Sequence, residues 1–259
     1  NAEAINNEKK TGFQLEVGDL LAKGSFSSTF LATTVPDMSG NFSEVAKVGL
    51  KKHHQKYAKE QEILHVVNGQ KHFPRLVLAG ESSKYTFIVM ELAGEDLKTV
   101  IERNRFGLTS NKNAIRLAHR LHGAVGFLHT KNFFHPRRRS SFLNYFLPAA
   151  LSPYCEAEDH CHVAVLCVKL LKDLSCIPRR RSVFWASHVT QFEFPKLEEE
   201  HQWIELIWMN LCGCVENKDT KFSFIATFLD AAVDGFDKRS DLDYNTNTGR
   251  LRLEDRDTD

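Results

Sequence analysis

The sequence lacks the long apolar segments that would carry it through a membrane. Its longest apolar runs, such as Tyr85 to Met90, fall far short of the roughly 20 residues that span a bilayer, and the first ten residues contain no apolar signal core. It also lacks an excess of charge of one sign, since 34 Lys and Arg face 33 Asp and Glu, which gives no reason to expect a nucleic acid or a membrane as partner. We therefore expect an intracellular protein, cytoplasmic or nuclear.

A disulfide scaffold is also absent. No cysteine precedes Cys155, and the six cysteines of the chain are too sparse to hold a small scaffold together, so reduced thiols are expected. The core must then be apolar. With 259 residues, 42% of them hydrophobic, the chain can bury a substantial core, either as one large domain or as two closely packed lobes.

The first part of the chain has the pattern of a mainly antiparallel sheet. Between residues 13 and 91, short β-branched and aromatic runs alternate with turn residues. One segment, "HHQKYAKEQEILHVV", breaks this pattern and predicts a helix. Its apolar residues at helical spacing are Tyr57, Ile63, Leu64 and Val67. Residues 13–91 are therefore predicted to form a β-rich small lobe.

From residue 92 the pattern becomes helical. A long helix is predicted over residues 110–131, beginning at a Thr109 or Ser110 cap. Its apolar face is formed by Ile115, Ala118, Leu121, Val125 and Leu128. Residues 92–251 are predicted to form a mainly helical large lobe, and the polar residues 252–259 a frayed tail. The fold class predicted for the chain is α+β.

Three short motifs stand in the predicted small lobe. "LAKGSFSSTFLA" contains Gly24 in a turn between two strands, "EVAKV" places Lys47 on a strand, and "KYAKEQEIL" places Glu60 on the helix. They resemble, in order, the glycine-rich loop, the third-strand lysine and the helix C glutamate of protein kinases, within them the casein kinase one and tau-tubulin kinase group. The resemblance covers about Phe13 to Leu251 and implies one bilobal kinase-like domain over residues 1–259, with a shortened large lobe.

The resemblance implies a set of nucleotide contacts. Gly24 would lie over the phosphates, and Lys47 would contact the α and β phosphates while paired with Glu60. "FIVMELAGEDL" is similar to the group's hinge, which places Met90 beside the adenine and lets the backbone of Glu91 and Leu92 bond the base. Binding of ATP, weak or independent of magnesium, stays open. Large side chains could also fill the pocket, and Phe26 and Phe142 are candidates.

The catalytic positions of the group hold other residues here. "HGAVGFLHTKNFFH" resembles the helix that leads into the catalytic loop, and His135 matches the first residue of the pattern H-R-D-x-K-P-x-N. Arg137 then replaces the catalytic Asp, Arg139 takes the place of the Lys, and Phe142 replaces the metal-binding Asn. A loop with this composition lacks the base.

The second metal position is also lost in this alignment. "VAVLCVKLL" matches the strand before D-F-G, which places Cys167 at the metal-binding Asp. A thiol cannot replace a carboxylate for magnesium, a hard cation that takes oxygen ligands. No metal is therefore expected. The resemblance indicates a pseudokinase that acts through protein partners, with catalysis not expected.

Three other readings remain open. An atypical active kinase would need Asp159 or Asp173 as displaced metal ligands. An anion- or RNA-binding protein would use the two P-R-R-R-S runs, although a nucleic acid is not the partner we expect. In "YCEAEDHCHV", zinc ligation by Cys155, His160, Cys161 and His162 competes with an ordinary polar loop, which we favour.

Overall fold

The computed structural model describes residues 5–6, 14–34, 42–104, 107–133, 156–172, 194–217, 221–232, 237, 240–245 and 252–253. The chain divides into two compact units, Asn1–Gly94 and Glu95–Asp259, close to the predicted change of pattern after residue 91. The catalytic-loop positions Arg137, Arg139 and Phe142, with Cys155 and Asp173, lie outside the described residues.

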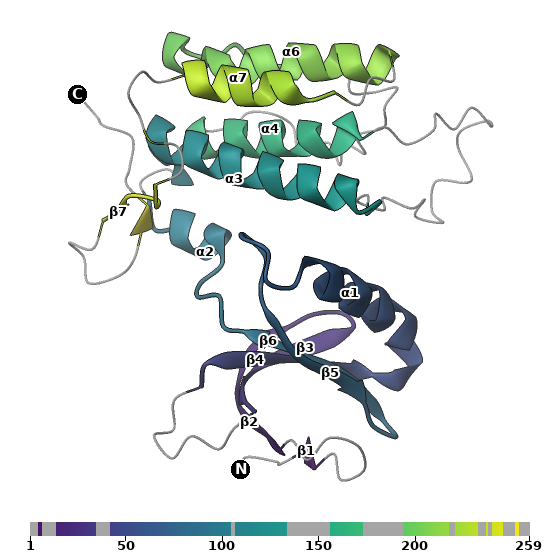
Figure 1. The fold of residues 1–259 in the computed structure, drawn as a ribbon. Helices are drawn as coiled ribbons and strands as arrows, with labels where there is room; N and C mark the ends of the chain where they lie inside the picture. Colours follow the sequence, from purple (N-terminus) through teal and green to yellow (C-terminus); the bar gives the residue numbers. More distant parts are fainter. Residues whose placement is uncertain are drawn as a thin grey trace, which may run out of the picture. The chain divides into compact units, whose positions relative to one another are not determined.

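The first unit is built on one antiparallel sheet with the strand order β1-β2-β3-β4-β6-β5 (Figure 1). The strands are β1 (Ile5–Asn6), β2 (Gln14–Lys23), β3 (Ser27–Thr33), β4 (Glu44–Leu50), β5 (Leu76–Glu81) and β6 (Tyr85–Glu91). After β4 the chain makes a single 3-10 turn, η1 (Lys51–His53), and continues into α1 (His54–Val67). The strands and the helix predicted for this region are confirmed.

The two faces of this sheet bury different residues. Because neighbouring strand residues point to opposite faces, Ala46 and Val48 of β4 lie on one face and Lys47 and Gly49 on the other. The first face packs Ala46 with Leu15, Ala32, Phe87 and Val89. On the other face, Tyr57 and Leu64 of α1 pack with Leu76 and Ile88 of the sheet. The helix α1 therefore covers the face that carries Lys47.

The second unit is mainly helical. Its helices are α2 (Leu97–Ile101), α3 (Asn111–Thr130), α4 (Ala157–Leu171), the 3-10 turn η3 (Glu199–His201), α6 (Gln202–Asn217) and α7 (Ser223–Ala231). Within this unit α3 and α4 lie side by side, as do α6 and α7 (Figure 1). The predicted long helix is confirmed as α3, and Ser110 caps it by accepting from the N–H of Asn113 at 3.3 Å.

A short C-terminal ladder completes the second unit. The strand β7 (Tyr244–Asn245) pairs with β8 (Arg252–Leu253), so the first two residues of the tail that we expected to fray are in a strand. Residues just before β7 are fastened to α3: the Asn113 side chain donates to the carbonyl of Asp243 at 3.0 Å and accepts from its N–H at 2.9 Å. Arg116 pairs with the Asp243 carboxylate at 2.5 Å.

The helix α4 overturns one prediction. The sequence "VAVLCVKLL" was expected to be the strand before a lost metal site, and the polar stretch before it a loop. The structure instead forms one helix that runs from Ala157 in the polar stretch to Leu171, in which Ala164, Cys167, Val168 and Leu171 recur at helical spacing and are buried in the core of the unit. An apolar run of this length suits a buried strand as well as a buried helix, so its periodicity did not decide between them.

No helix within the described ranges is both long enough and apolar enough to cross a membrane.

Candidate nucleotide-contact site

The expected ion pair between Lys47 and Glu60 is formed. The Lys47 Nζ lies 2.8 Å from Glu60 Oε1 and 2.7 Å from Oε2, which joins β4 to α1. Lys47 is held in the middle of the sheet, because it pairs with Thr29 of β3 on one side and Ile88 of β6 on the other. Both side chains keep part of their surface exposed, 29% for Lys47 and 37% for Glu60.

The turn that carries Gly24 is a tight hairpin. The N–H of Gly24 donates to the carbonyl of Ser27 at 2.8 Å, which closes the connection between β2 and β3. A Cβ on Gly24 would lie 3.4 Å from that carbonyl oxygen, an ordinary van der Waals distance, and the residue has no positive φ. The backbone of this turn therefore does not itself require glycine.

Phe26, at the tip of the turn, packs toward the start of α1. Its ring meets the His53 ring edge-on at 5.1 Å between centroids, and Lys56 Nζ lies 3.2 Å from its centroid, a cation–π contact. Within the first unit, the Phe26 ring therefore packs on the residues at the start of α1. Phe142, the other side chain expected to fill the pocket, lies outside the described residues.

The connector residues are ordered at the end of β6. Met90 pairs with Val45 of β4, the N–H of Glu91 donates to the carbonyl of Arg75 at 3.0 Å, and the N–H of Leu92 donates to that of Ser43 at 3.0 Å. These two N–H donors are therefore used inside the first unit. A base contact at these residues would have to come from their carbonyl oxygens, which narrows the expectation drawn from the sequence.

Cys167 cannot act at a metal site from its position in α4. It is fully buried in the helical core, and this burial raises the pKa of the thiol to about 12. The group is neutral and packs as a small apolar side chain. The strand position that the sequence alignment gave to Cys167 is wrong.

Asp159 is also unsuited to bind magnesium. Its carboxylate is buried between α3 and α4, where Oδ2 lies 3.0 Å from His129 Nε2. The sequence reading that used Asp159 as a displaced metal ligand would require this contact to break. Zinc at the same helix is equally disfavoured, because the consecutive residues His160, Cys161 and His162 of α4 point in directions about 100° apart.

A buried histidine pair beside Asp159 was not predicted. His122 Nδ1 lies 2.9 Å from His160 Nδ1, so one ring donates and the other accepts, and His160 also packs on Phe222 at 4.6 Å between ring centroids. Burial lowers the pKa of His160 to about 4 and that of His122 well below its ordinary value, so both rings are neutral. The spacing of His122 and His129, two turns apart on one predicted helix, places these two side chains on one face but does not indicate the contact with His160.

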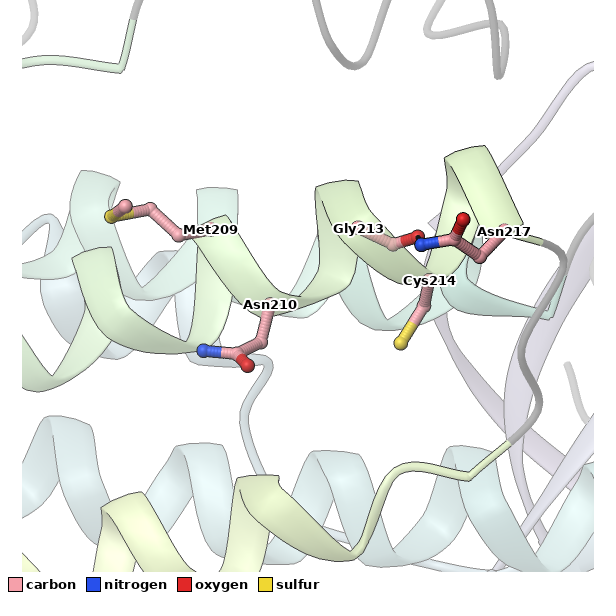
Figure 2. Close-up of a pocket in the computed structure, with 5 residues that line it drawn as sticks. All are labelled: Met209, Asn210, Gly213, Cys214 and Asn217. Carbon is pink, nitrogen blue, oxygen red and sulfur yellow. Dashed lines mark hydrogen bonds between the residues drawn. The ribbon is translucent and has the colours of Figure 1, made fainter.

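The remaining groups of interest lie on or near α6. A shallow hollow of about 410 Å³ is lined by Met209, Asn210, Gly213, Cys214 and Asn217 (Figure 2). Its two amides donate to carbonyls of their own helix, that of Leu206 at 2.8 Å and that of Gly213 at 3.0 Å, and none of these five residues is charged. At η3, the ligand atoms of Glu198, Glu200 and His201 lie within 4.8 Å of one another, with both carboxylates exposed.

Comparisons with known proteins bear on the fold. No protein-family model matches the chain. Among solved structures it is similar to one described as "Structure of vaccinia related kinase 3", with 15% identity and a TM-score of 0.56 over 86% of this chain and 88% of that one. A likeness at this identity shows the fold alone. The chain has an α+β, protein kinase-like fold, with an antiparallel sheet followed by a helical part, as predicted.

Proposed function

We propose that this chain is a pseudokinase: a kinase-like domain that transfers no phosphate and acts inside the cell as a scaffold or allosteric module for protein partners. The observation that carries this proposal is the segment between α3 and α4. Residues 131–156 contain no aspartate, and their one carboxylate side chain is Glu156, 3.9 Å from His129. Phosphoryl transfer in kinases needs an aspartate after the long helix to accept the proton of the substrate hydroxyl.

The charge of this segment supports the same proposal. In the place of the base and the metal ligand, the sequence holds Arg137 and Phe142, with Arg139 beside them. Kinase catalysis consists almost entirely of positioning and of neutralisation of charge by magnesium ions. A chain without either metal ligand loses the groups that hold those ions. Assignment to the casein kinase one and tau-tubulin kinase group is part of this proposal and rests on the sequence motifs.

Residual ATP binding is the second part of the proposal. Lys47 is held by Glu60 in the ion pair that kinases use to receive the nucleotide phosphates, and its side chain is partly exposed. Since the carboxylates that hold magnesium in kinases are missing, the nucleotide would bind weakly and without help from the metal.

The test combines a transfer assay with a binding assay. The purified chain is incubated with radiolabelled ATP, magnesium or manganese and a generic protein substrate, with an active kinase as positive control. We expect no label on the chain or the substrate. Transfer that disappears in a Lys47→Met variant would overturn the proposal, because contaminating kinases are not affected by that substitution.

A further inference from the structure

The first unit also carries a hollow, at the end of the sheet where β3 and β4 meet the turn between β2 and β3. It has a volume of about 340 Å³ and lies between the β2–β3 turn and the beginning of η1. Its lining includes Ser25, Phe26, Leu50, Lys52, His53 and Tyr85. Gly24 of the turn, Ser28 of β3, and Val48 and Gly49 of β4 also line it. We call it the β2–β3 hollow.

The lysines near this hollow are of two kinds: some form an ion pair with a carboxylate, and Lys52 and Lys56 do not form one with any described residue. Lys47 pairs with Glu60, Lys51 with Glu81 and Lys59 with Glu62. In contrast, no carboxylate from the described ranges forms an ion pair with Lys52, which lines the hollow. The same holds for Lys56, whose ammonium lies on the Phe26 ring at the rim. Among the described residues, these two positive charges are thus left without a carboxylate partner.

The helix that begins here increases the positive potential. The first turn of a helix favours acidic side chains, because its unpaired N–H groups carry partial positive charge. Neither η1 nor α1 has an acidic residue in its first turn, and neither has a side chain that caps it. Residues 51–56 instead read Lys-Lys-His-His-Gln-Lys. These positive charges repel one another and the positive end of the helix, and a bound anion would reduce this repulsion.

The rim of the hollow adds exposed apolar surface. Phe26, Leu50 and Tyr85 keep 49%, 47% and 42% of their surface exposed, although each is large and hydrophobic. Exposed apolar side chains that gather around a charged centre are typical of interaction surfaces. They favour a ligand that has both a negative group and an apolar group, separated by a few ångströms.

We propose that the β2–β3 hollow docks a phosphorylated segment of a partner protein. Lys52, with the hydroxyls of Ser25 and Ser28 in the same hollow, receives the phosphate, and Lys56 adds its charge at the rim. A phosphoserine offers nearly two negative charges and three acceptor oxygens to such donors, where a carboxylate offers one charge. An apolar side chain next to it packs on Phe26, Leu50 or Tyr85. The proposal rests on the proposed function only in taking a protein as the partner.

The probe is a pool of short peptides with a fixed phosphoserine and mixed residues on both sides. The pool is passed over the immobilised full chain without nucleotide, and a matched pool with serine or glutamate in place of phosphoserine runs in parallel. We expect the phosphorylated pool to be retained at least tenfold better than the other two. The sequences recovered should be enriched in an apolar residue within two positions of the phosphoserine.

Two variants with the same change of charge locate the binding. Lys52→Glu/Lys56→Glu reverses the unpaired charges and should reduce retention at least tenfold. Lys112→Glu/Lys169→Glu reverses two exposed lysines of the helical unit and should leave retention unchanged. Phe26→Ser should abolish the apolar preference while part of the phosphate binding persists. Thermal unfolding of each variant is measured beside the wild type, and each must unfold within a few degrees of it.

Three results would overturn the proposal. The first is equal retention of the phosphorylated and unphosphorylated pools by the wild type. The second is an equal loss in both double-lysine variants, and the third is tighter retention of a short single-stranded RNA than of the phosphopeptides at the same salt concentration. Since the assay contains no nucleotide and measures no transfer, a failure here leaves the pseudokinase proposal standing. Conversely, detection of kinase activity would leave this surface unaffected.

Discussion

Lys47 on β4 and Glu60 on α1, 13 positions apart in the sequence, form a two-oxygen ion pair with Nζ to oxygen distances of 2.7 and 2.8 Å. This pair ties the only α-helix described within Asn1–Gly94 to the centre of the sheet. The helix also packs on the sheet through Tyr57 and Leu64, so its attachment does not depend on the charges alone. The pair can therefore serve ligand binding without being essential to the fold.

The first prediction separates these two roles of the pair. Lys47→Ala should lower the free energy of unfolding by less than about 1 kcal/mol, because partly exposed ion pairs contribute little. The same substitution should remove any increase of the melting temperature caused by ATP. In the wild type that increase should be the same with magnesium and with EDTA. Thermal shift measurements over a range of ATP concentrations test it, with Lys112→Ala as the control. An increase that requires magnesium would contradict the prediction.

The second prediction compares two glycines of the first unit: Gly24 in the turn between β2 and β3, and Gly49 near the end of β4. A Cβ on Gly49 would lie 2.5 Å from two ring carbons of Tyr57, so Gly49→Ala should destabilise the fold by about 1 to 3 kcal/mol. Gly24→Ala meets no such obstacle and should change stability by less than about 0.5 kcal/mol. Urea unfolding of both variants provides the comparison. A larger effect at Gly24 would show that the turn needs its glycine for another reason.

The third prediction tests the position of Cys167. Cys167→Asp places a carboxylate in the apolar core between helices and should cost at least about 3 kcal/mol. Lys169→Asp introduces the same group on the exposed side of α4 and should cost less than about 1 kcal/mol. Circular dichroism during denaturation distinguishes the two. If Cys167 instead lay at the metal-binding position after a strand, as the sequence alignment suggested, Cys167→Asp would be tolerated as well as Lys169→Asp.

The fourth prediction is a loss of stability in mild acid. The pKa of His160 is lowered to about 4 and that of His122 is lowered well below the value of an unfolded histidine, about 6.5. Between these values the unfolded chain binds protons that the folded chain does not. Stability is therefore unaffected above about pH 7 and falls as the pH drops from about 6.5 toward 4. His160 alone accounts for about 3 kcal/mol over this range.

Several titratable groups face this pair. On α3 they are His119 and His129, on α4 Asp159, and just before α4, next to His129, Glu156. At the start of α7 the uncharged Phe222 ring packs on His160. The double variant His122→Leu/His160→Leu should flatten the dependence of the melting temperature on pH between 6.5 and 4. The exposed His65→Gln should not change it, and a profile that stays steep in the double variant would refute the assignment.

The fifth prediction concerns the attachment of the C-terminal segment. Asn113 is fully buried and makes both of its side-chain bonds to the backbone of Asp243. Asn113→Ala should cost about 2 to 3 kcal/mol, because it leaves the N–H and carbonyl of Asp243 with no partner from α3. Asn210→Ala, on the exposed side of α6, removes an amide of the same kind and should cost less than about 0.5 kcal/mol. Hydrogen exchange at residues 241–245 should accelerate in the first variant alone.

Local patterns in the sequence predicted the parts of the fold that depend on neighbours in the chain. The strands between residues 13 and 91, the helix α1 and the helix α3 with its Ser110 cap all follow from periodicity and capping chemistry. The pairing of Lys47 with Glu60 was implied by the resemblance of their two motifs to those of protein kinases. α4 was missed because its apolar run suits a buried strand equally well, and because Glu156 before it provides no side-chain cap.

The contacts that could not be predicted join residues far apart in the sequence. His122 and His160 are 38 positions apart, and nothing in the local pattern of either helix indicates that the two rings meet. The use of the Glu91 and Leu92 N–H groups inside the first unit was also invisible, because it depends on the register between β4, β6 and the residues beside them. The β2–β3 hollow could not be predicted either, because it forms between the β2–β3 turn and η1, which are separated in the sequence by β3 and β4.

The bonds between Asn113 and Asp243 also govern when the second unit can finish folding. The two residues are 130 positions apart, so α3 leaves the ribosome long before its buried amide can be satisfied. At synthesis rates of about 5 to 20 residues per second, this delay lasts from several seconds to nearly half a minute. During that time one side of α3 is open to water and to chaperones. We therefore expect nascent chains that end before residue 240 to be held by chaperones and to be more sensitive to protease than longer ones.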